Sequence, residues 1–329
     1  MPPRFSVKVP DFGYWTEMVK CRTGCPVRTD ARGYVRAIAE GRFEEAYRIA
    51  REPNPFASVC GRVCAASCEA ACRRGAVDEP VAIRSLKRFL TERYGVEARR
   101  PLGAPTGVRL ILRDSRPPEV CTPWDLSVLR ETGAEVRSKT RGRRVAVVGS
   151  GVAGLTCAHD LTLLGYQVTV FEAQEVPGGM LVLGVPEYRL PRDLVRKEIQ
   201  AVLDLGVELK LNHALGREFR LGDLRAQGYE AVFLAIGAHK GRDLRIEGVQ
   251  LDGVFRAVEF LLNVNLGFRV DLGDRVVVVG GGTAPWTRRA RPRGPFRAAA
   301  RSRSRPTPRR CRRRWTWRGR RSAPARAKS

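Results

Sequence analysis

Six of the nine cysteines in this chain of 329 residues lie within its first 72 residues. Two stand in the segment CRTGCP, and four recur at every fourth position in VCGRVCAASCEAAC. They are Cys21, Cys25, Cys60, Cys64, Cys68 and Cys72. On a helix, a spacing of four places thiolates along one slowly drifting face, where they can bind several irons of one cluster.

The chemistry of sulfur narrows the choice of metal. Soft thiolates favour iron–sulfur clusters or zinc over hard cations. Zinc sites more often use cysteines that are separated by two residues, a spacing that the chain lacks, and the CP that ends CRTGCP is common beside cubane ligands. We therefore expect a 4Fe-4S cluster, with zinc and a merely apolar cysteine face as alternatives. Cys121, Cys157 and Cys311 are isolated, and Cys157 is expected in the core.

A glycine-rich turn is the second candidate site. Gly149, Gly151 and Gly154 form G-x-G-x-x-G between a β-branched run and a helical segment, and Glu172 ends the next predicted strand. Such glycines permit a tight turn, close approach of the backbone to a pyrophosphate and helix–sheet packing. The carboxylate suits ribose hydroxyls and repels a 2′-phosphate. We expect a dinucleotide other than NADP here; the alternative is an α/β protein without a ligand at this turn.

The loop EVPGGMLVLGVPEYRLP distinguishes FAD from NAD at this turn. Its two glycines let the backbone pass close to a ligand. Its spacing from Glu172 resembles that of flavoprotein reductases, where the loop covers the flavin end of FAD, and AVFLAIGA resembles a later segment near the same cofactor. We therefore favour FAD, and we nominate no catalytic acid, base or nucleophile. The predicted cofactor-binding residues are Gly149, Gly151, Ala153, Gly154, Glu172, Gly178, Gly179, Gly237, Gly280 and Gly282.

The elements that carry the early cysteines are predicted to be helices. Apolar residues recur at helical spacing in YVRAIAEGRFEEAYRIA, with Gly41 separating two helices and Pro53 ending the second. EPVAIRSLKRFLTERYG is a further amphipathic helix, which stops near Gly95. We assign residues 1–100 to a helical iron–sulfur domain. Residues 101–140 are assigned to a linker with one short helix around PWDLSVLRETG.

From Arg143 onward, predicted strands alternate with helices, which implies a parallel sheet with crossovers. The predicted fold class is therefore α/β with an all-α N-terminal iron–sulfur domain. Residues 141–273 form the expected Rossmann-like FAD domain. Residues 274–283, where DRVVVVGGG provides a strand and a second glycine turn, begin an incomplete NAD(P)H domain. Residues 284–329 form a disordered tail rich in arginine and proline.

The formal net charge of +26 is concentrated in this tail, which holds 18 Lys and Arg but no Asp or Glu. The first 283 residues carry 42 basic and 34 acidic side chains. One interpretation is a basic arm that binds nucleic acid, with Trp315 and Trp317 stacking on bases; another is a solvated tail. We instead expect out-of-frame translation from about Thr283, because prolines such as Pro285 break the helix that should follow the second glycine turn.

Neither a signal peptide nor a membrane span is visible. The N-terminal segment MPPRFSVKVPDFGYW lacks an apolar core, and no apolar run approaches the roughly 18 residues that cross a bilayer. We therefore expect a cytoplasmic protein without a membrane partner. Cysteines stay reduced there, so a dense cysteine group indicates metal before disulfides.

The two halves together resemble one family, the small (beta) subunit of NADPH-dependent glutamate synthase and the related N-terminal half of dihydropyrimidine dehydrogenase. The matching segments are CRTGCPV, NPFASVCGRVCAASCEAAC, PVAIRSLKRF, VAVVGSGVAGLTCAHDL, PGGMLVLGVPEYRLP and VVVVGGG. The resemblance implies a helical domain with iron–sulfur clusters, then an FAD domain interrupted by an NADPH domain. It implies that hydride passes from NADPH to the flavin and that single electrons leave through the clusters. A partner subunit or missing C-terminal domain would reduce the substrate, and nucleic-acid binding by the tail is not expected to be physiological.

The cysteine pattern departs from this family in two ways. An extra cysteine pair before Cys21 is absent, and two all-cysteine cubanes need more ligands than the six present, so one cluster is favoured over two. The positions that match family ligands are Cys21, Cys25, Cys64, Cys68 and Cys72. Cys60 matches a position that relatives need not use. Lys87 stands where relatives supply a non-cysteine ligand, which an ammonium cannot be. The assignment of ligands, the choice between NADPH and NADH and the final electron acceptor stay open.

Overall fold

The computed structural model describes residues 18–99, 140, 142–241, 246–270, 272 and 274–279. The chain divides into two compact units, and the first contains the described residues up to Gly241 together with Ala257–Val270. The described residues of the second unit form neither a helix nor a strand. None of the helices in the described part of the chain has the length and apolar character that a bilayer crossing requires.

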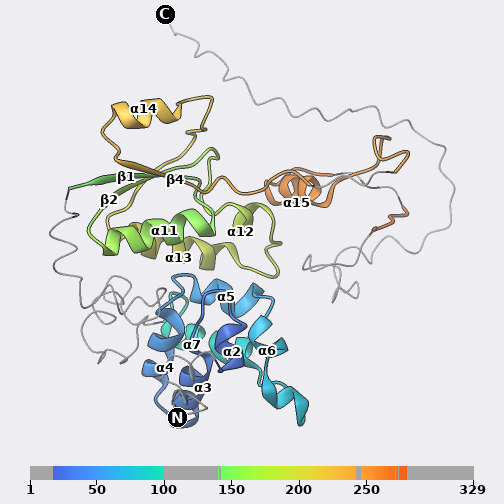
Figure 1. Ribbon diagram of the computed structural model, residues 1–329. Coiled ribbons are helices and arrows are strands. Elements are labelled where there is room, and N and C mark those ends of the chain that lie inside the picture. Colours follow the sequence, from blue (N-terminus) through green and yellow to red (C-terminus); the bar gives the residue numbers. More distant parts are fainter. Residues whose placement is uncertain are drawn as a thin grey trace, which may run out of the picture. The chain divides into compact units, whose positions relative to one another are not determined.

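The N-terminal part of the first unit is helical, as predicted (Figure 1). Its elements are α2 (Lys20–Thr23), α3 (Ala31–Ala39), α4 (Phe43–Arg51), α5 (Ala57–Val63), α6 (Ser67–Ala70), the 3₁₀ helix η1 (Arg73–Ala76) and α7 (Ile83–Tyr94). Asp30 caps α3 by accepting a hydrogen bond from the Gly33 N–H at 2.9 Å. The fully buried side chains of Tyr34 and Leu90 lie in the core of this part.

The following part of the unit is a four-stranded sheet in the order β3-β2-β1-β4, and every strand pair is parallel. The strands are β1 (Arg144–Val148), β2 (Gln167–Phe171), β3 (Glu208–Lys210) and β4 (Ala231–Leu234). The helices are α11 (Val152–Leu163), α12 (Met180–Leu183), α13 (Arg192–Leu203), α14 (Leu221–Ala226) and α15 (Ala257–Asn265). The predicted alternation of strands and helices is therefore confirmed.

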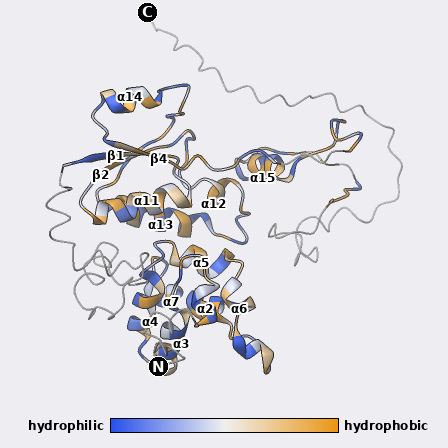
Figure 2. Ribbon diagram, in the orientation of Figure 1, coloured by the Kyte–Doolittle hydropathy of each residue, from blue (hydrophilic) through white to orange (hydrophobic). Residues whose placement is uncertain are grey.

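Successive residues of β1 face opposite sides of the sheet. Val147 belongs to a buried cluster with Leu155 of α11 and Val195 of α13, whereas Val148 belongs to one with Leu224 of α14. Helices α11 and α13 accordingly cover one face and α14 the other (Figure 1). The central strands β1 and β2 are coloured mainly as hydrophobic in Figure 2 and are buried along most of their length, as expected for parallel strands that are covered on both faces. The outer strand β4 is mostly exposed.

Helix α5, which carries Cys60, is tied to the α/β part of the unit. Val59 belongs to the same buried cluster as Val147. Glu198 of α13 is 1% exposed, and its carboxylate accepts hydrogen bonds from the backbone N–H groups of Ser58 at 2.9 Å and Val59 at 3.5 Å. The first N–H groups of a helix have no partner within it, so Glu198 caps α5 from another part of the fold.

This cap makes stability depend on pH. Burial raises the pKa of Glu198 above its ordinary value, although Arg51 and the two N–H donors act in the opposite direction. A carboxyl whose pKa is raised on folding stabilises the native state at low pH, and this contribution is lost as pH rises through the folded pKa. A difference in pKa between the folded and unfolded states is a difference in stability that varies with pH. We therefore expect the free energy of unfolding to fall less between pH 5 and pH 8 in Glu198→Gln than in the unchanged chain.

Denaturant titrations at the two pH values measure this difference. Glu175→Gln removes an exposed carboxylate, and it should leave the pH dependence of the unchanged chain intact. An equal loss of stability with pH in Glu198→Gln and in the unchanged chain would contradict the assignment.

The predicted strand of DRVVVVGGG is not formed. Val276–Val279 have no regular secondary structure, and each is at least 53% exposed. A β-branched run becomes a parallel strand only beside a neighbour, and the described residues of the second unit offer no other strand. Gly280, Gly282, the short linker helix around PWDLSVLRETG and the tail lie outside the described residues.

Candidate cofactor sites

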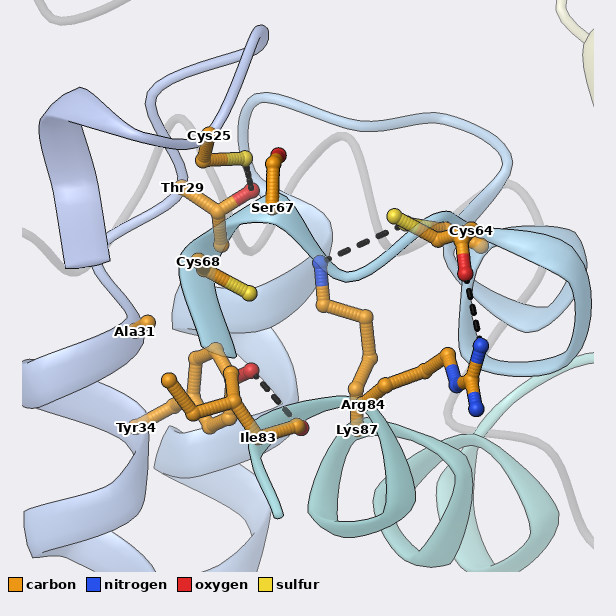
Figure 3. A pocket seen from close by; sticks show the side chains of 11 residues that line it. Cys25, Thr29, Ala31, Tyr34, Cys64, Ser67, Cys68, Ile83, Arg84 and Lys87 are labelled. Atoms are coloured by element: carbon orange, nitrogen blue, oxygen red, sulfur yellow. Dashed lines mark hydrogen bonds between the residues drawn. The ribbon is translucent and has the colours of Figure 1, made fainter. Parts of the chain in front are cut away.

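Four of the six early cysteines line one pocket in the helical part (Figure 3). Cys25 follows α2, Cys60 lies within α5, Cys64 is the C-cap of α5, and Cys68 lies in α6. Three separate segments of the chain therefore contribute sulfur to the same place. The non-cysteine lining includes Tyr34, Arg84 and Lys87.

The regular spacing of the cysteines does not correspond to one continuous helix. Helix α5 ends at Val63, Cys64 has an extended backbone with φ −58° and ψ 142°, and Ala66 is left-handed with φ 55°. The next short helix begins only at Ser67. The expectation of a single cysteine-bearing helical face is thus wrong, because the chain breaks between the second and third thiols.

Cys21 and Cys72 do not line the pocket. Cys21 lies in α2, and burial is the main cause that raises its pKa, with a smaller contribution from the charge of Cys72. Cys72 directly precedes η1. Among the described side chains, no three from His, Cys, Asp and Glu already form a group that could hold a metal ion. The structure therefore brings four of the predicted ligands together around a pocket and leaves two elsewhere.

The pocket stabilises a thiolate at Cys64. A hydrogen bond from the Cys60 thiol, a backbone N–H from Ala66 at 3.3 Å and the charges of Lys87 and Arg84 together lower the pKa of Cys64 to about 6. The same hydrogen bond raises the pKa of Cys60. Burial raises the pKa of Cys68 to about 11. Since the thiolate is the form that binds metal, the cations favour metal binding on the Cys64 side of the pocket.

Two cationic side chains of α7 reach the pocket. Arg84 donates from Nη1 to the carbonyl oxygen of Cys64 at 2.7 Å. Lys87 is 5% exposed, and its Nζ lies 3.8 Å from Sγ of Cys60. A soft donor set beside buried positive charge is suited to an anionic thiolate–metal centre. The residues present therefore fit an iron–sulfur cluster.

The glycine turn between β1 and α11 is packed closely on one side and open on the other. Gly149 has φ +107°, and an added Cβ would collide with the Ala235 carbonyl; a Cβ on Gly154 would collide with the Gly149 carbonyl. A Cβ on Gly151, in contrast, would meet no heavy atom within 4 Å. No side chain in the described part of the chain caps α11. Its first N–H groups, near the exposed Ala153, are free to bind phosphate oxygens.

Glu172 lies against this turn. Its Oε2 accepts hydrogen bonds from the Ser150 N–H at 2.8 Å and the Ser150 hydroxyl at 2.6 Å, and its Oε1 accepts one from the Gln174 N–H at 2.8 Å. A carboxylate can accept about four hydrogen bonds, so capacity for a ribose hydroxyl remains. The carboxylate predicted to hold ribose is therefore fixed at the phosphate turn.

The second glycine pair also contacts the turn. The Gly178 N–H donates to the Ser150 carbonyl at 3.0 Å, and a Cβ on Gly179 would lie 3.0 Å from Cα of Gly151. Gly237 follows β4, which pairs with β1 directly before the turn. Most of the predicted FAD residues thus gather at the carboxyl ends of the strands, where ligands bind in open parallel sheets.

Sequence reasoning missed Glu198, although its pattern held a signal. In the helix RDLVRKEIQAVL, a carboxylate stands among the buried apolar positions Leu194, Val195, Ile199 and Val202. A charge within an apolar stripe indicates a buried partner. The partner, however, is the backbone N–H of Ser58, which lies 140 residues away in the chain and cannot be inferred from the helix alone.

Two family models match the chain. Residues 16–98 match "Dihydroprymidine dehydrogenase domain II, 4Fe-4S cluster", and residues 143–284 match "Pyridine nucleotide-disulphide oxidoreductase". The arginine-rich tail lies almost entirely beyond both matches. Both matched regions belong to redox proteins.

Similar proteins cover the same region. The NADP(+)-dependent formate dehydrogenase subunit beta of Moorella thermoacetica is 41% identical over 265 residues, which is 80% of this chain and 36% of that protein. The glutamate synthase [NADPH] small chain of Escherichia coli is 30% identical over 275 residues, or 80% of this chain and 51% of its own length. The solved structure of Mycobacterium tuberculosis FprA with NADPH is 27% identical, covers 38% of this chain and 29% of its own, and gives a TM-score of 0.35. This chain thus spans between 36% and 51% of the two relatives.

Proposed function

Because this chain belongs to the family of FAD- and iron–sulfur-dependent NAD(P)H oxidoreductases that includes the glutamate synthase small chain, we propose that it is an electron-transfer module. It takes electrons from NAD(P)H and passes them through an iron–sulfur cluster to a partner. FAD, when bound, accepts two electrons together and releases them singly. One observation carries the proposal: a four-thiol pocket and a dinucleotide-type glycine turn lie in the same compact unit.

We propose that one 4Fe-4S cluster is held by Cys25, Cys60, Cys64 and Cys68. These are the thiols that share a pocket, and four thiolates complete an all-cysteine cubane. Cys60 supplies the fourth ligand because Lys87, as an ammonium, has no lone pair to offer. On this proposal Cys21 and Cys72, which the sequence also nominated, do not bind this cluster.

The glycine turn binds FAD in this proposal. The N–H groups from Gly151 to Gly154, including that of Ala153, hold the pyrophosphate, and Glu172 holds the adenosine ribose. The other nominated glycines, Gly178, Gly179 and Gly237, line the flavin end of the site. The close backbone contact between the two glycine segments supports a shared site for one ligand.

The nicotinamide nucleotide is assigned to the second glycine turn, with Gly280 and Gly282. We propose the domain boundaries that the sequence suggests: a helical cluster domain over 1–100, a linker over 101–140, an FAD domain over 141–273 and the start of an NAD(P)H domain over 274–283. The two separate family matches, over residues 16–98 and 143–284, support the division between the helical domain and the part that follows it. We propose that the segment from about Thr283 is out of frame. Sequencing of the gene across Gly280 to Thr287 tests this, and an intact frame there, with the same tail in sister genes, would count against it.

The acceptor of the electrons is a partner subunit or domain. Both relatives named above are subunits or chains of larger enzymes by their names, and we propose the same arrangement, in the cytoplasm, for this chain. The alternative of a basic nucleic-acid-binding protein is not favoured, since both family models describe redox domains.

Cofactor analysis tests the proposed function directly. The full chain, purified without oxygen and reconstituted with FAD, iron and sulfide, is expected to bind flavin and the four iron atoms of one 4Fe-4S cluster. Its absorption should show flavin bands with a broad iron–sulfur shoulder. A well-folded preparation that retains neither group would refute the proposal. A colourless protein that shifts nucleic acid at low salt would favour the alternative.

A further inference from the structure

We propose that Lys87 is a positioning residue that raises the reduction potential of the cluster by placing a buried positive charge beside the Cys60 ligand. This inference rests on the proposed function, because it requires a cluster in the four-thiol pocket. Lys87 stands at the position where relatives supply a non-cysteine ligand to the cluster, but an ammonium group cannot bind iron.

The ammonium of Lys87 lies beside a ligand sulfur. Lys87 projects from α7 into the pocket (Figure 3), and its Nζ lies 3.8 Å from Sγ of Cys60. The ring of Tyr34 flanks it, with Nζ 5.8 Å from the ring centroid. The Tyr34 hydroxyl donates to the carbonyl of Ile83 at 3.0 Å, so it is directed to the backbone. Among the described side chains that line the pocket, Lys87 therefore offers N–H donors to a cysteine sulfur.

The buried charge of Lys87 needs a partner of opposite charge. A buried ammonium is costly unless a negative charge lies beside it. Within the described part of the chain, no carboxylate forms an ion pair with Lys87. Glu69 of α6 and Glu92 of α7 have other partners: Glu69 accepts the backbone N–H of Arg84, and Glu92 pairs with Arg62 and Arg88. The sulfur ligands are consequently the counter-charge that the fold provides for Lys87.

A positive charge beside the cluster also changes how readily the cluster accepts an electron. A cubane with four thiolate ligands is anionic, and its reduction adds one further negative charge. A fixed cation and an N–H donor beside a ligand sulfur favour the more negative state, and hydrogen bonds to sulfur and local charge are among the factors that set cluster potentials. Burial weakens screening by solvent, so the effect of Lys87 should exceed that of an exposed cation.

Replacement of Lys87 tests this inference. Lys87→Met removes the charge and keeps an unbranched side chain, whereas Lys87→Arg keeps the charge. Arg88→Gln is the matched control, since it removes one charge from the same helix at an exposed site. Each full-length variant is reconstituted, its iron is counted, and its cluster is titrated potentiometrically by electron paramagnetic resonance.

At a fixed solution potential, the ratio of reduced to oxidised cluster should fall about tenfold or more in Lys87→Met, which corresponds to about 59 mV for one electron. Lys87→Arg should recover most of this ratio, and Arg88→Gln should change it little. Equal potentials for Lys87→Met and the unchanged chain, at equal iron content, would overturn the proposal. If Lys87→Met loses iron, retention of iron by Lys87→Arg supports a role of charge, and loss in both overturns it. Absence of iron in the unchanged chain would instead refute the proposed function.

Discussion

Replacement of Cys68 by serine is expected to abolish stable iron binding, while replacement of Cys72 leaves it intact. The two residues stand four positions apart in the segment CEAAC, so sequence spacing treats them alike. The structure separates them: Cys68 lines the four-thiol pocket, and Cys72 lies outside it before η1. Iron content after anaerobic reconstitution is the measurement. Equal loss of iron in the two variants would contradict the ligand set proposed here.

Cys60→Ser and Cys21→Ser form a second matched pair for the same question. The resemblance to relatives would make Cys21 a ligand and Cys60 dispensable, whereas the pocket predicts the reverse. The iron content should therefore fall several-fold in Cys60→Ser and stay unchanged in Cys21→Ser. The reverse outcome would mean that Cys60 is not the fourth ligand and that another group takes this position. Circular dichroism of both variants controls for folding.

The glycine turn was predictable from the sequence because its determinants are local. A β-branched strand, three glycines at fixed spacing and a following helix specify the same geometry wherever they occur. The structure accordingly places Gly149, Gly151 and Gly154 as expected, with Glu172 hydrogen-bonded at the end of the next strand. Short-range patterns of this kind specify their local structure without contacts to distant residues.

The grouping of the cysteines was not predictable, because it depends on a break that the spacing conceals. Ala66 adopts φ 55°, a left-handed conformation that is uncommon for residues other than glycine, asparagine and aspartate. The segment CAASC gives no sign of this left-handed residue, since alanine is a strong helix former. The break is stabilised by tertiary contacts instead, such as the hydrogen bonds of Glu69 and Arg84 between neighbouring segments.

The Glu198 cap and the missing strand illustrate the same limit at longer range. The cap joins positions 140 residues apart, and only the folded unit brings them together. Val276–Val279 have the composition of a buried strand, but they have no strand partner among the described residues. Propensity describes what a segment can form, and its neighbours decide whether it does.

Substitutions of Gly151 and Gly154 are expected to separate cofactor binding from folding at the glycine turn. Gly151 has φ −69° and ψ 178°, which alanine adopts freely, and the added Cβ would enter open space. Gly151→Ala should therefore leave the stability of the apoprotein within about 0.5 kcal/mol of the unchanged chain. The same methyl group occupies the space through which the backbone approaches the pyrophosphate. FAD affinity should fall at least about tenfold, or about 1.4 kcal/mol.

Gly154→Ala is the contrasting variant, because its Cβ would collide with the carbonyl oxygen of Gly149 within the turn itself. We expect it to destabilise the apoprotein by about 1–3 kcal/mol, as overpacking does, and to lose FAD as a consequence. Denaturant unfolding of the apoproteins and fluorescence titration with FAD measure the two quantities separately. If Gly151→Ala binds FAD as tightly as the unchanged chain, the pyrophosphate does not lie at the N-terminus of α11. If it is instead as unstable as Gly154→Ala, the open side of the turn is filled by protein, and the turn serves packing alone.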